Sequence, residues 1–216
     1  MGILICECAL IVEPNLGFVL YSLLVAGVLI ALSKFEVLNN ESKTLIALLV
    51  IPIIKIAEIF IDFNFLWKVF IFYIIFGSMA VYYFIRFEIK ANFSRASFKR
   101  IIIALILGIS LGIAGRYVLN IQIDQAFIAL IPLVAFSEEL FFRGILQNLA
   151  SKSYGERAAI FLTSLLFFIF TLSLGVYPAV FFFVVSFLIG LLYEYSQNVF
   201  LCILASACIN AIIMIF

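Results

Sequence analysis

The sequence predicts an all-α protein, a polytopic bundle of about eight transmembrane helices. Composition gives the first reason, because 67% of the 216 residues are hydrophobic and 12% are charged, whereas soluble domains are about half apolar and about a quarter charged. The second reason is that the apolar residues gather in runs of roughly the 20 residues that cross a bilayer as a helix. The whole chain, 1–216, is therefore expected to form a single integral membrane domain.

Eight runs are long and apolar enough to be spans. In chain order they are Leu16–Ser33, Thr44–Ile61, Trp67–Phe87, Ile101–Leu119, Ala126–Ala150, Ala158–Leu174, Tyr177–Tyr195 and Val199–Phe216. The links between the runs are short, except Phe87–Arg100. In the fourth run Gly108, Gly112 and Gly115 share one helix face, a pattern typical of closely packed transmembrane helices.

Positive charges in the loops predict the orientation. The loop between the third and fourth runs holds Lys90, Arg95, Lys99 and Arg100. This loop should be cytoplasmic, and alternation then puts the loops Lys34–Lys43 and Lys152–Arg157 on the same side. Both termini are expected outside. No positive charge precedes the first run, which favours an uncleaved anchor.

Composition also excludes several classes of function. The chain has no histidine, which rules out a Ser-His triad, a Cys-His dyad and a His-ligated zinc site. Its net charge of +1 and lack of a basic arm argue against a nucleic-acid partner. We predict no metal and no cofactor. Cys202 and Cys208 are interpreted as small apolar fillers of the last span, and the role of Cys6 and Cys8 stays open.

Charged residues inside a span cost about 2.5–3.5 kcal/mol each on insertion scales, so they are expected to face protein or water. Lys55 and Glu58 are three apart in the second run and can pair on one helix face. A self-neutralised pair is favoured there over a role in a cavity.

The fifth run contains a more unusual cluster, Glu138, Glu139 and Arg143. Glu139 and Arg143 are four apart and can pair along the helix, whereas Glu138 is rotated by about 100° from its neighbour. A structural Glu–Arg pair explains two of these residues but leaves Glu138 without a partner close in sequence. Two carboxylates in different surroundings can supply a base near neutral pH, so the cluster predicts a functional site.

This cluster resembles the first motif, EExxxR, of the CAAX protease and bacteriocin-processing (CPBP, or Abi) family of intramembrane proteases. The likeness covers roughly 131–212, which we take as a CPBP-like core. The family's second motif, FxxxH, corresponds to Phe167 followed by Thr171 in place of the histidine. Its third motif, HxxxN, corresponds to Ser206 in place of the histidine, followed by Asn210.

The resemblance implies an intramembrane endopeptidase that works without a metal. Glu138 would activate a water, Glu139 and Arg143 would complete the first motif, and Thr171, Ser206 and Asn210 would hold the water and the oxyanion. The implied substrate is a membrane-bound peptide, a lipidated protein or a bacteriocin precursor. The implied location is a prokaryotic plasma membrane. The orientation predicted from the loop charges puts Arg143 toward the cytoplasmic end of its span, so the site should open to that side.

Two other functions stay open. The alternative is a catalytically impaired relative that binds a membrane peptide, as an immunity factor does, and the loss of both motif histidines is the reason for it. A proton-coupled transporter using Glu138 and the Lys55–Glu58 pair is less favoured, because matched broken helices are missing from the two halves of the sequence.

Overall fold

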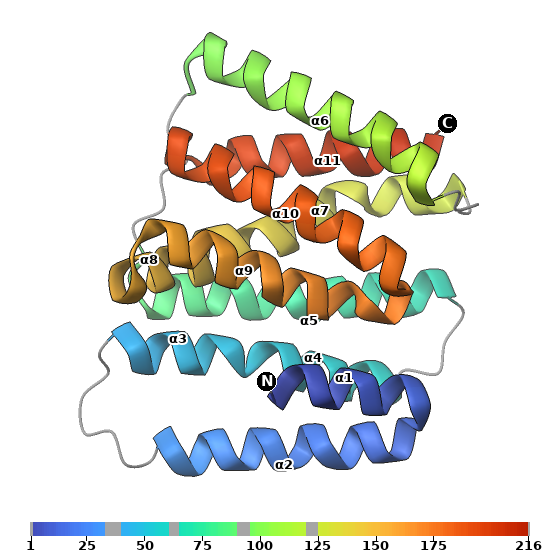
Figure 1. The fold of residues 1–216 in the computed structure, drawn as a ribbon, viewed down its shortest axis with the longest axis vertical. Helices are drawn as coiled ribbons and strands as arrows, with labels where there is room; N and C mark the ends of the chain where they lie inside the picture. Colours follow the sequence, from blue (N-terminus) through green and yellow to red (C-terminus); the bar gives the residue numbers. More distant parts are fainter. Residues whose placement is uncertain (1, 33–39, 61–64, 90–95, 120–124, 216) are drawn as a thin grey trace.

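The computed structural model describes residues 2–32, 40–60, 65–89, 96–119 and 125–215, and these residues form a bundle of helices (Figure 1). The all-α fold class is therefore confirmed. The elements are α1 (Gly2–Val12), α2 (Pro14–Leu32), α3 (Asn40–Leu48), α4 (Val50–Phe60), α5 (Phe65–Arg86), α6 (Phe98–Leu119), η1 (Gln125–Leu130), α7 (Ile131–Glu139), η2 (Leu140–Gln147), α8 (Asn148–Tyr154), α9 (Glu156–Thr171), η3 (Leu172–Leu174), α10 (Val176–Ser196) and α11 (Val199–Ile215).

The long helices run roughly along a common direction, with α2 at one edge of the bundle and α6 at the other (Figure 1). Helix α6 packs on α11, α10 packs on α9, and α7 lies against both α5 and α11. The middle of the bundle is thus built from α5, α7, α9, α10 and α11, and it is there that the predicted cluster of charges lies.

Four of the described helices are long and apolar enough to cross a membrane, namely Leu66–Arg86, Phe98–Leu119, Glu156–Leu174 and Val176–Ser196. The second predicted run is divided between α3 and α4, which meet at Leu49. Helix α1 was not among the predicted runs, although it is apolar and helical. The orientation rests in part on Lys34, Lys90 and Arg95, which lie outside the described residues, so it stays a prediction.

Two glycines end helices in the C-terminal half. Gly155, between α8 and α9, has φ of 83°, and Gly175, between η3 and α10, has φ of 109°. Both angles lie in a region that residues with a Cβ atom avoid. These two turns reverse the chain, so that α9 and α10 lie next to each other and close to η2.

The glycine face predicted for the fourth run is confirmed. Gly108, Gly112 and Gly115 are buried in α6. A Cβ atom on Gly112 would lie 2.8 Å from the Cβ of Ile212 in α11, closer than real Cβ atoms approach. The contact between α6 and α11 therefore depends on these glycines. The same contact fixes the position of α11, the helix that carries Ser206 and Asn210.

Candidate intramembrane active site

The first motif lies where the helix changes its winding. Helix α7 ends at Glu139, and the chain continues as a π-helix, η2, whose eight residues are all buried. π-Helical segments are rare and frequently occur at functional sites. The wider winding begins directly after the two glutamates and includes Arg143.

A small internal cavity lies beside these residues. Its polar lining comes from α7, η2, α10 and α11, and consists of Glu138, Glu139, Arg143, Ser186, Ser206 and Asn210. Apolar side chains of α9, α10 and α11 complete its wall. The cavity measures about 20 Å³, enough to hold one water molecule among polar partners. The structure thus brings the first motif together with Ser206 and Asn210.

Glu139 and Arg143 form the ion pair that their spacing predicts. The Nε of Arg143 lies 3.4 Å from Oε2 of Glu139, and both side chains are almost fully buried. The Nη2 of Arg143 donates to the backbone carbonyl of Ser186 at 2.9 Å and to its hydroxyl at 2.8 Å. The hydroxyl of Ser206 donates to the Glu139 carboxylate. Glu139 therefore has partners on η2 and on α11, which stabilise its charge.

Glu138 has a different partner, from the N-terminal half of the chain. The hydroxyl of Tyr73, on α5, donates to Oε1 of Glu138 over 2.6 Å. Glu138 is also part of the cavity wall. Its side chain therefore connects α5 with the cavity. Sequence reasoning missed Tyr73, since nothing in the spacing connects two residues 65 positions apart.

Thr171 is the predicted site residue that the cavity does not include. Its hydroxyl donates to the carbonyls of Phe167 and Phe168, one turn back in its own helix, at 2.9 and 3.2 Å. Phe167 lines the cavity from the same helix. The structure therefore gives Thr171 no direct contact with the cavity, and its correspondence to the motif histidine stays a prediction.

A second buried ionic contact lies in the N-terminal half. The Nζ of Lys55 is 3.6 Å from Oε1 of Glu7 in α1, and the Tyr21 hydroxyl donates to the same oxygen over 2.6 Å. Lys55 also lies 5.2 Å from the centre of the Phe170 ring. The predicted partner, Glu58, has a side chain outside the described part, so that pair stays a prediction. The observed partner belongs to a helix absent from the predicted spans.

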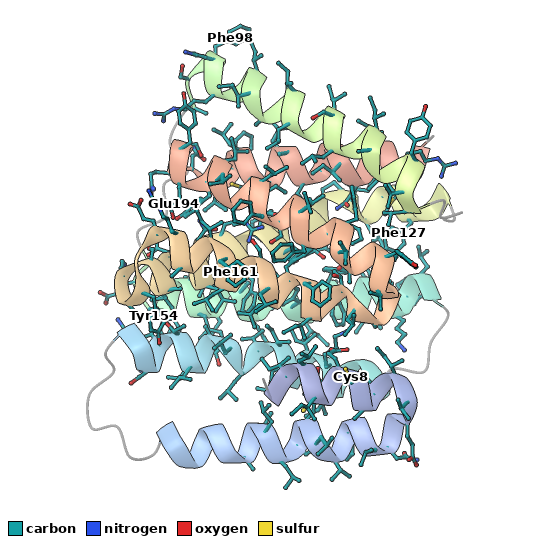
Figure 2. The ribbon with its side chains drawn as sticks, in the orientation of Figure 1. Cys8, Phe98, Phe127, Tyr154, Phe161 and Glu194 are labelled. Atoms are coloured by element: carbon teal, nitrogen blue, oxygen red, sulfur yellow. The ribbon has the colours of Figure 1, made fainter. Side chains whose placement is uncertain are left out.

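The remaining candidate ligands are dispersed. Cys202 and Cys208 are free thiols in α11, the former buried and the latter partly buried, as expected of small fillers. Cys6 and Cys8 are free thiols of α1, and Cys8 is exposed (Figure 2). Among the residues that the structure describes, no three side chains of His, Cys, Asp or Glu gather in a way that would hold a metal ion.

Comparison with known proteins supports the interpretation of the motif. Residues 124–212 match the model of a family described as type II CAAX prenyl endopeptidase Rce1-like. No curated protein and no solved structure matches the chain. The matched residues run from the start of η1 into α11 and include the first motif, Ser206 and Asn210. Residues 124–212 are therefore similar to the Rce1-like CAAX endopeptidases, in agreement with the resemblance to the CPBP family that the Glu138 motif carries.

Proposed function

We propose that this integral membrane protein is a glutamate-dependent endopeptidase that hydrolyses a peptide bond of a lipidated, membrane-bound protein. The observation that carries the proposal is the cavity shared by Glu138, Ser206 and Asn210, which has room for one water. A carboxylate can take a proton from water as a general base, and hydrogen-bonding side chains can stabilise the oxyanion that forms. The family description supports a prenylated substrate.

In the proposed reaction, Glu138 takes a proton from the water as its oxygen bonds to the scissile carbonyl carbon. The carbonyl oxygen becomes an oxyanion, which accepts a hydrogen bond from the Asn210 amide. The Ser206 hydroxyl can donate a second one only by turning away from the Glu139 carboxylate. Collapse of this intermediate breaks the carbon–nitrogen bond, and Glu138 returns its proton to the departing amine. The ion pair of Glu139 and Arg143 keeps the neighbouring charge neutralised throughout.

The size of the cavity sets a condition on substrate binding. Pockets for organic ligands measure about 300–1,000 Å³, whereas this cavity measures about 20 Å³. A peptide therefore reaches Glu138 only after side chains in the wall move aside. Phe167 of α9 and Phe182 of α10 are the large apolar residues of that wall, and their displacement would open the site between these helices.

The test is cleavage of a fluorescent, C-terminally prenylated peptide by the purified protein in liposomes, with the products identified by mass spectrometry. A general base contributes about 10²- to 10⁴-fold to the rate, so Glu138→Gln is expected to lower kcat by that factor. Glu156→Gln, at an exposed position at the start of α9, is the matched control. Wild-type turnover by Glu138→Gln refutes the glutamate mechanism. Binding of the peptide without cleavage by the wild type would support the non-catalytic alternative instead.

A further inference from the structure

Tyr73 donates a hydrogen bond to Glu138 from a helix that lies outside the family match. Its hydroxyl lies 2.6 Å from Oε1 of Glu138, while the family match begins only at residue 124. A distance of this length is typical of a strong hydrogen bond between a hydroxyl and a charged carboxylate. The α5 segment therefore contributes directly to the candidate site.

The backbone around Tyr73 is fixed by a close approach of α5 and α7. The hydroxyl of Ser137 lies 2.8 Å from the Leu133 carbonyl of its own helix and 3.2 Å from the Tyr73 carbonyl. A Cβ atom on Gly77 would come within 2.7 Å of this hydroxyl. The absence of a side chain at Gly77 thus lets α7 approach α5 at the residue before Glu138.

The ring of Tyr73 is held as well. It packs edge-to-face on Phe72 with ring centres 5.0 Å apart, and lies 6.3 Å from the ring centre of Phe76. A half-buried phenol with aromatic neighbours and a backbone fixed through Ser137 has few alternative orientations. Its hydroxyl is therefore preorganised toward Glu138.

We propose that Tyr73 is a positioning residue of the hydrolytic site, which anchors Oε1 of Glu138 and leaves Oε2 to take the proton from water. This inference rests on the proposed function. A glutamate side chain has three rotatable torsions, and a donor on one oxygen restricts them. Since Thr171 bonds to its own helix, Tyr73 supplies a fixed polar contact that the second motif does not.

The experiment compares Tyr73→Phe with the wild type in the liposome assay. Losing a hydrogen bond to a charged group corresponds to about a 10- to 100-fold fall in kcat, with KM unchanged because the phenol does not line the cavity. Tyr82→Phe, an exposed tyrosine of the same helix, is the matched control. Wild-type kcat in Tyr73→Phe, or a change confined to KM, overturns the inference.

A double-mutant cycle separates positioning from general damage to the fold. In the background of Glu138→Ala, the carboxylate is gone, so Tyr73→Phe is expected to shift the melting temperature by less than it does in the wild type. Equal shifts in both backgrounds overturn the inference even if kcat falls. If Glu138→Gln abolishes cleavage while Tyr73→Phe retains it, the proposed function stands and this inference fails. Wild-type cleavage by both variants refutes both.

Discussion

Arg143 offers a direct test of how the site tolerates charge inside the bundle. Its side chain is fully buried, lies 3.4 Å from Glu139, and donates two hydrogen bonds to Ser186. Arg143→Met keeps the length and apolar stem of the side chain but leaves the Glu139 carboxylate as a buried charge without its cation. The prediction is a large loss of stability.

The magnitude follows from what remains after the substitution. Removing one partner of a buried ion pair costs about 3–5 kcal/mol. For a chain of 216 residues, each kcal/mol corresponds to about 2–4 °C in melting temperature, so Arg143→Met should melt about 6–20 °C lower. The hydroxyl of Ser206 still donates to Glu139, which places the expected loss nearer the lower limit. Fluorescence-monitored thermal unfolding in detergent measures it.

The double variant Glu139→Gln with Arg143→Met decides whether uncompensated charge is the cause. Both side chains are then neutral, and replacing a whole buried pair by neutral groups is often without cost. The double variant should therefore recover at least half of the melting temperature that Arg143→Met loses. Arg157→Met, at an exposed position in α9, is the control. A double variant that melts lower than Arg143→Met refutes the reasoning.

Two further predictions concern the polar side chains of α9 and α11 and the glycines of α6 and α2. Asn210→Ala should lower kcat about 10²- to 10³-fold, the usual effect of losing an oxyanion donor. Thr171→Val should leave kcat unchanged, because the Thr171 hydroxyl donates to a carbonyl of its own helix. The liposome assay measures both variants, and equal effects on kcat contradict the assignment of Asn210. Gly112→Ala should lower the melting temperature, because the new Cβ atom would clash with Ile212. Gly27→Ala should raise the melting temperature, because the space around Gly27 is open and alanine has the higher helix propensity. Stabilisation by Gly112→Ala in the thermal scan contradicts the packing argument.

Features set by spacing along one helix were predictable from the sequence. The ion pair of Glu139 with Arg143 follows from two residues four apart, and it forms even though η2 is wound as a π-helix. The shared face of Gly108, Gly112 and Gly115 likewise follows from spacing and is buried. In these cases the covalent chain itself brings the residues together, so no knowledge of the neighbouring helices is needed.

Features that depend on how helices pack were not predictable in the same way. The sequence of an apolar membrane helix contains few polar residues that indicate which face is directed toward the centre of the bundle. Thr171 is a residue for which the predicted position at the site was not reproduced. It follows Phe167 at the spacing of the second motif, yet Phe167 lines the cavity and Thr171 does not. Helix α1 was missed for a related reason, since its eleven residues are too few for a predicted span.

Three buried carboxylates make the general point. Glu7 contacts Lys55 and Tyr21, Glu138 accepts from Tyr73, and Glu139 contacts Arg143 and Ser206. Burial of each charge is so costly that a partner is required. The sequence alone establishes that requirement for Glu138 and Glu139, whereas Glu7 lies in a helix that was not among the predicted spans. The identity of the partner is a property of the tertiary packing unless it lies within one turn. Hence the acid whose partner is local, Glu139, is the one whose surroundings spacing could predict, while the proposed base, Glu138, depends on a helix that the motif does not contain.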